Sequence, residues 1–360
     1  MFFFLSAFYF FYFASVGIYI IFFPKVIFDI GYTSAQVGII FAVAPLMRFI
    51  TPFFFLKHIK LTQRVFNLAV IVSLLNSLLF YFTIEHFYLF LFNNIILGIS
   101  LSMMLPFVET IALKELGNRY GKSRLYGSIG FIASSLILAQ YLSQTHTPFT
   151  AVNFYIFTAF FTTIFAIIIS NSNDTQTKSN QDDEPFSLIK HKYFWASIFM
   201  MQVSFGGFYN FFTIYETSHD ISLEMTSYLW SFGVLCEIVI FYFQAPFLKN
   251  NLITLIKFSI AITSIRWLLL FLFPDSLTIA FVSQSIHAFS FGLYHTTVIM
   301  YLYKIYDNKK LAQQFMFGIA YGLGGSIGAV IAGWTYGEYL FLYSFVFGVI
   351  SYLFLRKLKI

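Results

Sequence analysis

Cysteine and charge are both scarce in this sequence of 360 residues, and each scarcity excludes a class of protein. The single cysteine, Cys236, excludes an internal disulfide and a thiolate metal cluster. Only 10% of the residues are charged, against roughly a quarter in soluble domains, whereas 59% are hydrophobic. This composition predicts a polytopic membrane protein. The first residues lack a basic segment and a cleavage site, so we expect a retained span there.

Polar breaks divide the apolar sequence into stretches of membrane-spanning length. A helix needs about 20 apolar residues to cross the hydrocarbon layer, and irregular backbone facing lipid would leave its polar groups unpaired. We therefore predict an all-α membrane protein with twelve transmembrane helices, at 2–23, 35–56, 65–83, 87–108, 123–142, 151–170, 194–215, 225–247, 253–273, 277–303, 313–336 and 339–355.

Long polar segments are also nearly absent, with one exception at 171–185 (NSNDTQTKSNQDDEP), which is typical of a flexible linker. We predict an N-terminal six-helix bundle (1–170), a cytoplasmic linker (171–193) and a C-terminal six-helix bundle (194–360). If the N-terminus is cytoplasmic, eighteen of the 21 Lys and Arg residues fall on the inner side. This bias predicts a multi-pass protein of the inner (plasma) membrane with both termini cytoplasmic, and it explains the net charge of +6 without nucleic acid.

The two halves of the sequence resemble each other at a nearly constant offset. A shift of 189 residues superposes Gly17 on Gly206 and Arg48 on Glu237, and a shift of 198 carries GSIG at 127–130 onto GSIG at 325–328. Such ordered matches indicate two parallel repeats related by a pseudo-twofold axis along the membrane normal, with a binding site at their interface. We expect the GSIG glycines to allow close helix contacts.

Ionisable side chains within spans are costly unless they face a partner or water. Four of them occur in the consecutive spans 8 to 10: Glu237, Arg266, His287 and His295. Together they supply a proton acceptor, a positive charge that can hold an anion, and imidazoles that titrate near neutral pH. We interpret them as a substrate- and proton-binding site. The two histidines are eight residues apart, so both can face one broad side of a helix; each is equally compatible with a neutral imidazole bonded between helices.

Three further charged residues are candidates in the first half. Arg48 has the position of Glu237 in the other repeat, so the axis would bring the two together across a central cavity as a pair that forms and breaks. The alternative is that each is paired within its own half for folding. Glu109 and Arg124 flank the turn between spans 4 and 5; a solvated carboxylate at a helix end and an arginine reaching the inner surface would explain them equally.

Metal and enzyme chemistry are poorly supported by the sequence. The acidic and histidine residues of spans 8 to 10 lack the HxxxH, HExxH and ExxH spacings on any one helix, so we expect neither a metal site nor a cofactor. The outer loops are short, and the acidic run at 182–184 lies in the low-complexity linker. These features argue against a membrane-embedded enzyme.

Strings around the charged residues resemble the major facilitator superfamily, within it the branch of the bacterial 3-phenylpropionate permease, itself similar to lactose and nucleoside proton symporters. The strings are 120–128 (YGKSRLYGS), 228–241 (YLWSFGVLCEIVIF), 265–267 (IRW) and 284–295 (QSIHAFSFGLYH). The resemblance implies a twelve-helix permease that works by alternating access with proton coupling.

The resemblance also implies roles for individual residues. The lactose permease has a glutamate on helix 8, an arginine on helix 9 and a histidine on helix 10, which correspond to Glu237, Arg266 and one histidine of span 10. Its sugar-contacting pair on helices 4 and 5 corresponds to Glu109 and Arg124. Its second glutamate on helix 10 has no counterpart, which leaves the proton to Glu237 or a histidine. The loop at 56–65 (LKHIKLTQRV) keeps cations but lacks the superfamily's Asp and Gly.

We therefore predict a secondary active transporter for proton-coupled symport of a small organic solute. In-span arginines and abundant aromatic surface favour an aromatic or other monocarboxylate. A sugar or nucleoside proton symporter and a drug or metabolite exporter are the alternatives. The expected partners are the small-molecule substrate, protons and the lipid bilayer, and the expected state is a monomer.

Overall fold

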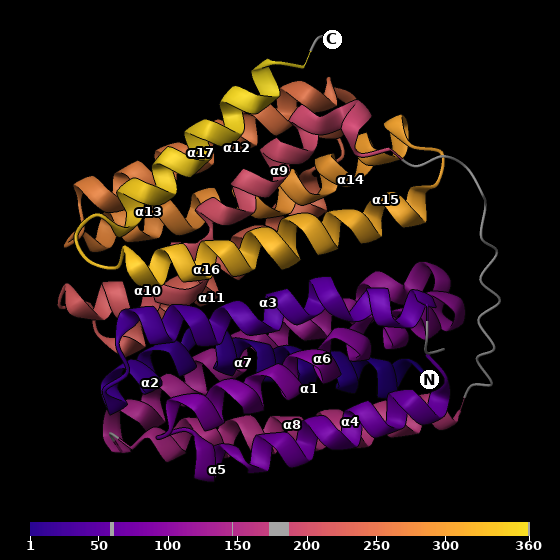
Figure 1. Ribbon diagram of the computed structural model, residues 1–360, viewed down its shortest axis with the longest axis vertical. Helices are drawn as coiled ribbons and strands as arrows, with labels where there is room; N and C mark the ends of the chain where they lie inside the picture. The colour runs from indigo at the N-terminus through magenta and orange to yellow at the C-terminus, as the bar shows by residue number, and fades with distance from the viewer. Residues whose placement is uncertain (58–60, 146, 173–186, 359–360) are drawn as a thin grey trace. The chain divides into compact units, whose positions relative to one another are not determined.

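The computed structural model describes residues 1–57, 61–145, 147–172 and 187–358, and all regular structure in these ranges is helical. Contacts divide the chain into two units, 1–179 and 180–360. Most of the predicted linker, including the acidic run at 182–184, lies outside the described residues. The first unit contains α1 (Phe2–Ile21), α2 (Phe23–Ile30), α3 (Ser34–Lys57), α4 (Gln63–Leu78), α5 (Phe80–Thr83), α6 (Phe87–Leu116), the 3-10 turn η1 (Gly117–Arg119), α7 (Tyr120–Thr145) and α8 (Pro148–Asn171) (Figure 1).

The second unit begins with a 3-10 turn and contains two π-helices within its long helical rods. Its elements are η2 (Ile189–His191), α9 (Lys192–Ser204), α10 (Gly206–Ser218), α11 (Leu223–Phe243), η3 (Phe247–Lys249), α12 (Leu252–Leu272), α13 (Leu277–His287), the π-helix η4 (Ala288–Leu293), α14 (Tyr294–Ile305), α15 (Lys309–Phe315), the π-helix η5 (Met316–Gly324), α16 (Gly325–Trp334) and α17 (Leu340–Arg356).

Each of the twelve predicted spans coincides with one helix or with helices that follow one another directly, which is consistent with the predicted count. By length and hydropathy alone, seven described segments are able to cross a membrane. The two largest boundary errors are in the first half: the helical run of the first span continues through α2 to Ile30, beyond the predicted end at 23. α6 extends to Leu116, beyond the predicted end at 108, because its last residues (ETIALKEL) are mostly good helix formers. The chain then turns through Gly117, whose φ of 48° suits glycine.

Side-chain caps set where several helices begin. Thr33 and Gln36 form a reciprocal pair at the start of α3, in which the Gln36 side chain accepts from the Thr33 amide at 2.9 Å. Ser222 caps α11 and Asn251 caps α12 by accepting hydrogen bonds from amides of the first turn. These caps place the starts of the two helices that carry Glu237 and Arg266.

The helix pairings of the first unit recur in the second, six spans later. In the first unit α1 packs on α7 and α8, α3 packs on α6, and α4 packs on α6 and α8. In the second unit the rod of α9 and α10 packs on η5, α16 and α17, α11 packs on α13, and α12 packs on α14 and α17. The same pairings, taken in the same order of spans, support the internal repeat seen in the sequence.

Three of the four GSIG glycines, Gly127, Gly130 and Gly328, lie at close helix contacts, as predicted. A Cβ at Gly130 would collide with the Phe10 carbonyl oxygen of α1, and a Cβ at Gly328 would lie 2.7 Å from the Val203 carbonyl oxygen of α9. Gly206 meets Gly328 so closely that a Cβ there would collide with the Gly328 carbonyl group. Glycine therefore permits the closest helix approach at equivalent pairings of both units.

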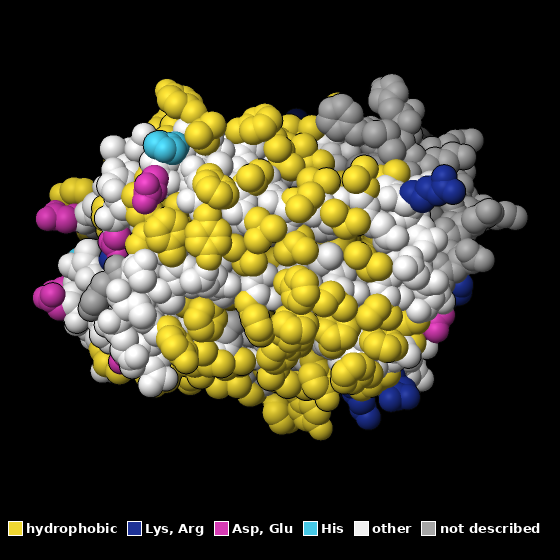
Figure 2. All heavy atoms as spheres, turned by 90° about the horizontal axis from the view of Figure 1, so that it is seen from below, with side chains coloured by type: hydrophobic (Ala, Val, Ile, Leu, Met, Phe, Trp, Pro, Cys, Tyr) yellow, Lys and Arg dark blue, Asp and Glu magenta, His cyan; other side chains and the backbone are white. Residues whose placement is uncertain are grey.

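The surface has the pattern of a protein that sits in a bilayer. On the face shown in Figure 2, hydrophobic side chains cover the middle, most Asp and Glu side chains lie toward one end, and most Lys and Arg side chains lie toward the other. Exposed apolar residues of the first unit include Leu68, Leu75, Phe92 and Phe157. Such exposure would be unusual in water and is expected where lipid tails cover the surface.

Candidate functional site

The second unit joins three of the predicted residues in one hydrogen-bonded chain. Nη1 of Arg266, on α12, lies 2.8 Å from Nδ1 of His287, at the end of α13. Nε2 of His287 lies 2.7 Å from Oε1 of Glu237, on α11. Three helices thus bring a guanidinium, an imidazole and a carboxylate into line.

Hydrogen-bonding capacity fixes the tautomer of His287. A guanidinium only donates, so Nδ1 of His287 must accept from Arg266 and cannot carry a proton. The proton of the neutral imidazole is then on Nε2, which donates to the Glu237 carboxylate. A second proton on His287 would be on Nδ1, and this N–H group would then face the Nη1–H group of Arg266 without an acceptor between them. The imidazole is therefore neutral here and lies between a cation and an anion.

Arg266 is fully enclosed, with an exposed fraction of 0%. Its Nε donates to the Ser283 hydroxyl group at 3.1 Å and its Nη2 to Oε1 of the Gln284 side chain at 3.4 Å. The guanidinium also lies between aromatic rings, 4.1 Å from the Phe208 centroid and 4.5 Å from that of Trp267. With these contacts made, Arg266 has no accessible surface with which to hold a solute in this conformation.

His295 faces the same side as His287, as predicted, but it does not join the chain. The ring of Phe291 stacks between the two imidazoles, with centroids 5.7 Å from His287 and 5.9 Å from His295. Nδ1 of His295 lies instead 2.7 Å from the Tyr321 hydroxyl group. Phe291 is in the π-helix η4 and Tyr321 in the π-helix η5, and π-helical turns are frequent at functional sites.

The first unit pairs two of the other three predicted residues, Glu109 and Arg124. Nε of Arg124, on α7, donates to Oε1 of Glu109, on α6, at 3.3 Å, and each side chain is about one-third exposed. The Arg124 guanidinium also stacks 4.0 Å from the Phe13 ring centroid. The Tyr12 hydroxyl is within electrostatic reach of Arg48, Glu109 and Arg124.

Arg48 differs from Arg124 and Arg266 in its surroundings. Its side chain is exposed on α3, and it takes part in none of the ion pairs formed by the described residues. Glu237, in contrast, has its partner His287 within its own unit. The predicted pairing of Arg48 with Glu237 across a cavity stays a prediction.

Sequence reasoning missed several residues that surround the chain of three. Ser283 and Gln284 hold Arg266, and Tyr321 lies within electrostatic reach of Glu237. The first two had a signal, because they precede His287 by four and three residues and so share its helix face. Tyr321 had none, because tyrosine is common throughout the chain.

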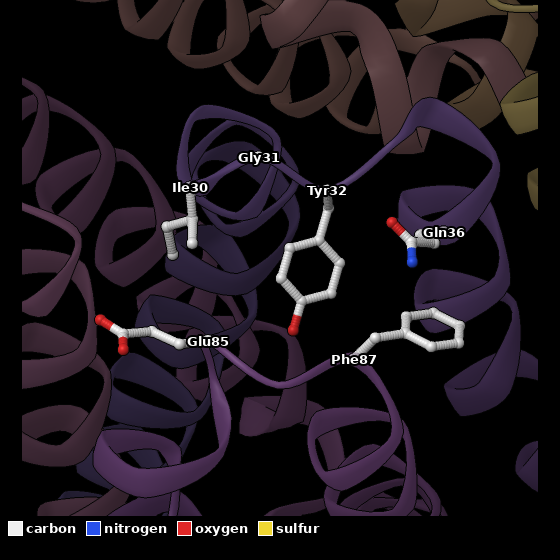
Figure 3. A pocket seen from close by; sticks show the side chains of 6 residues that line it. All are labelled: Ile30, Gly31, Tyr32, Gln36, Glu85 and Phe87. Atoms are coloured by element: carbon white, nitrogen blue, oxygen red, sulfur yellow. The ribbon is translucent and has the colours of Figure 1, made fainter.

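A pocket of about 180 Å³ in the first unit contains none of the predicted residues (Figure 3). It lies where α2, α3, α5 and α6 meet, and is lined by Ile30, Gly31, Tyr32, Gln36, Glu85 and Phe87. The Tyr32 hydroxyl donates to the Ile84 carbonyl oxygen at 2.8 Å. Burial, and to a smaller extent the Glu85 carboxylate, raises the pKa of Tyr32 to about 12. The Gln36 side chain is bonded in the α3 cap and the Tyr32 hydroxyl group to Ile84, so these polar groups of the pocket stabilise the adjacent loops.

Comparison with known proteins places these helices and charges in a family. The model of the MFS_1 like family matches residues 2–347. The chain belongs to this family. It is thus a polytopic membrane transporter of the major facilitator type, which moves small molecules and is not an enzyme, as the sequence predicted.

Two relatives align with this transporter over most of its length. The uncharacterized transporter YwbF of Bacillus subtilis (strain 168) is 27% identical over 335 residues, which cover 88% of this chain and 80% of the relative. The probable 3-phenylpropionic acid transporter of Escherichia coli (strain K12) is 23% identical over 347 residues, which cover 92% and 90%.

Solved structures show the same fold. The nucleoside transporter NupG matches with a TM-score of 0.81 and 14% identity, covering 99% of both chains. An auto-inhibited peptide transporter of the POT family matches with a TM-score of 0.74 and 9% identity, covering 99% of this chain and 96% of the other. These identities are low, so the likeness concerns the fold alone.

Proposed function

We propose that this transporter carries out proton-coupled symport of a small organic monocarboxylate by alternating access. The observation that carries the proposal is the line of Arg266, His287 and Glu237, in which a neutral imidazole joins a buried cation to a carboxylate that is still 15% exposed. The positive Arg266, the neutral His287 and the negative Glu237 together have a net charge of zero until one proton binds. Such a site can change between two conformations without exposing an unpaired charge to lipid.

Glu237 is the proton carrier in this proposal. His287 cannot take a proton at Nδ1 while Arg266 donates to that atom. The carboxylate of Glu237 can take a proton, because the carboxyl oxygen that stays unprotonated still accepts the hydrogen bond from His287. The superfamily glutamate missing from helix 10 is therefore not required. Protonation turns the zwitterionic line into a net cation, which favours entry of an anion.

Arg48 is the proposed anchor for the carboxylate of the substrate. It is the in-span arginine with an exposed side chain and no ion-pair partner among the described residues, whereas Arg266 is enclosed and Arg124 is paired with Glu109. The related Escherichia coli protein is named as a probable transporter of 3-phenylpropionic acid, an aromatic monocarboxylate. The carboxylate of such a substrate matches a guanidinium that has no ion-pair partner among the described residues.

The orientation and assembly belong to the same proposal. We place both termini and the linker in the cytoplasm of a bacterial cell, the protein in the inner membrane, the bundles at 1–170 and 194–360, and the transporter as a monomer. The lysine and arginine bias of the sequence, and the separation of acidic from basic ends in Figure 2, support this orientation.

Uptake into proteoliposomes tests the function. With an inward proton gradient, labelled 3-phenylpropionate is expected to accumulate, and an uncoupler is expected to abolish the accumulation. Labelled nucleoside and sugar are measured in parallel, because the Glu109–Arg124 pair, already neutralised, would suit an uncharged solute. Accumulation of either neutral solute in place of the carboxylate would reject the proposed substrate class. Accumulation that ignores the uncoupler would reject proton coupling.

Replacing Arg48 by glutamine is expected to raise the KM for the carboxylate by about tenfold or more, because one charge-assisted hydrogen bond contributes roughly 1.5–3 kcal/mol. The measurement is the concentration dependence of uptake. Arg64→Gln is the matched control, since Arg64 is an exposed arginine in the same unit. An unchanged KM in Arg48→Gln would remove Arg48 from the site.

A further inference from the structure

Glu216 is a buried carboxyl group that the proposed mechanism does not use. It lies in the last turn of α10, and its exposed fraction is 0%. Neither of its carboxyl oxygens has a hydrogen-bond partner, and it joins none of the ion pairs of the described residues. Glu109 and Glu237 differ, because Arg124 and His287 pair with them.

Among the described residues, none near Glu216 supplies a compensating cation. Its neighbour Tyr215 directs its hydroxyl group away, to the Leu270 carbonyl oxygen at 3.2 Å. The side chain of His219 contacts the Tyr215 carbonyl oxygen at 2.8 Å. The titratable groups at this end of the unit are Tyr215, His219 and Asp220 around the end of α10, Glu224 on α11, Asp275 between α12 and α13, Tyr336, Glu338 and Tyr339 between α16 and α17, and Tyr343 on α17. The list holds no lysine or arginine.

An ionised carboxylate in such a place would be strongly disfavoured. Removing a charge from water without a partner costs many kcal/mol, and a carboxylic acid avoids this cost by keeping its proton. The neutral acid still buries an unpaired hydroxyl donor and an unpaired carbonyl acceptor, but this costs far less than an unpaired charge. The observed burial without partners is therefore the environment of a protonated glutamic acid.

The local backbone keeps Glu216 close to water without exposing it. The backbone carbonyl oxygen of Glu216 accepts hydrogen bonds from the backbone amides of His219 and Ile221, both at 3.1 Å, and these bonds close the end of α10. The chain then turns at Asp220, whose φ is 60°. Ser218 and Asp220 are exposed, so bulk water lies within about one helical turn of the carboxyl group. A small opening of this turn would let the proton leave.

We propose that Glu216 is a second proton-binding site, separate from the line of Arg266, His287 and Glu237. In the conformation described, the carboxyl group holds the proton; when the end of α10 opens, the proton passes to water and a hydrated carboxylate remains. α9 and α10 form one rod that begins after the linker and ends on the opposite side of the membrane. With the linker in the cytoplasm, as proposed above, Glu216 is on the outer side. The burial of Glu216 carries the inference, which does not depend on the substrate.

Infrared spectroscopy of the purified protein tests the site directly. At pH 7, the carbonyl stretch of a protonated carboxylic acid is expected in the native protein, to shift on labelling with 13C-glutamate, and to lose intensity in Glu216→Gln. Glu338→Gln, at an exposed glutamate of the same end, is expected to leave the band unchanged. A native protein without a glutamate-derived band at pH 7 would overturn the proposal, and so would an unchanged band in Glu216→Gln.

Thermal unfolding gives a second readout. The folded protein binds a proton at Glu216 that an unfolded glutamate releases above about pH 4.3, so this group makes Tm fall as pH rises. Glu216→Gln is expected to remove that part of the pH dependence, and an unaltered dependence would contradict the proposal. Neither readout uses transport, so a failure here leaves proton-coupled uptake untouched, and a failure of uptake leaves this site untouched.

Discussion

Replacing Arg266 by lysine is expected to reduce proton-driven uptake by about 100-fold and to destabilise the protein by roughly 3 kcal/mol. The guanidinium makes its contacts as a planar fork, to Ser283, to Gln284 and to His287, while its faces lie on Phe208 and Trp267. An ammonium group presents three tetrahedral donors and cannot reach the same acceptors together. The lost contact with His287 would free Nδ1, and the histidine could then take the proton intended for Glu237.

Uptake and thermal unfolding of the purified variant measure both effects. Arg356→Lys is the matched control, because Arg356 is exposed at the end of α17 and the same substitution there removes no buried contact. If Arg266→Lys keeps uptake within a few-fold of the native protein, positive charge alone is sufficient at this position. The geometric argument for the line of three would then be wrong.

Replacing Gly206 by alanine is expected to prevent assembly of the second unit. A Cβ at this position would collide with the carbonyl group of Gly328, which is backbone and cannot rotate away as a side chain would. Forcing the two helices apart costs about 1–3 kcal/mol or more, and it would disturb the whole contact of α10 with α16. The expected result is a loss of most of the monodisperse protein in size-exclusion chromatography and a lower Tm in what remains.

Gly121→Ala supplies the comparison. Gly121 is also a helical glycine, on α7, but a Cβ there meets no atom within 4 Å. Alanine has the better helix propensity by about 1 kcal/mol, so this variant should be as stable as the native protein or slightly more so. Equal yields of the two variants would show that close approach at Gly206 is not needed for folding.

The sequence was sufficient for the helices, and for the three residues that the structure joins, because both depend on strong local signals. Apolar stretches bounded by polar residues give the spans, and in-span charges are rare enough for Glu237, Arg266 and His287 to stand out. Their role as a binding site stays a prediction. The surroundings of His295 could not be predicted from the sequence in the same way. A regular helix explains why it faces the same side as His287, but nothing in the spacing shows that the Phe291 ring would separate the two.

Two other features could not be predicted because they depend on packing between distant segments. Glu216 falls one residue beyond the predicted end of span 7 at 215, where a glutamate normally marks the return to water. The structure continues α10 to Ser218 and buries this glutamate completely. Likewise, Arg48 and Arg266 are both arginines within spans, and only the tertiary contacts make one free and the other enclosed.

The π-helices of the second unit give two long rods a second possible register. Each widened turn holds more residues than an α-helical turn of the same rise, so its conversion to α-helix would rotate everything beyond it by about 100° for each residue shifted. In η4 such a conversion would swing His295 out of the ring stack, and in η5 it would take the Tyr321 hydroxyl from its imidazole partner. A twist within two helices is thus enough to separate His295 from Tyr321 without breaking any covalent bond.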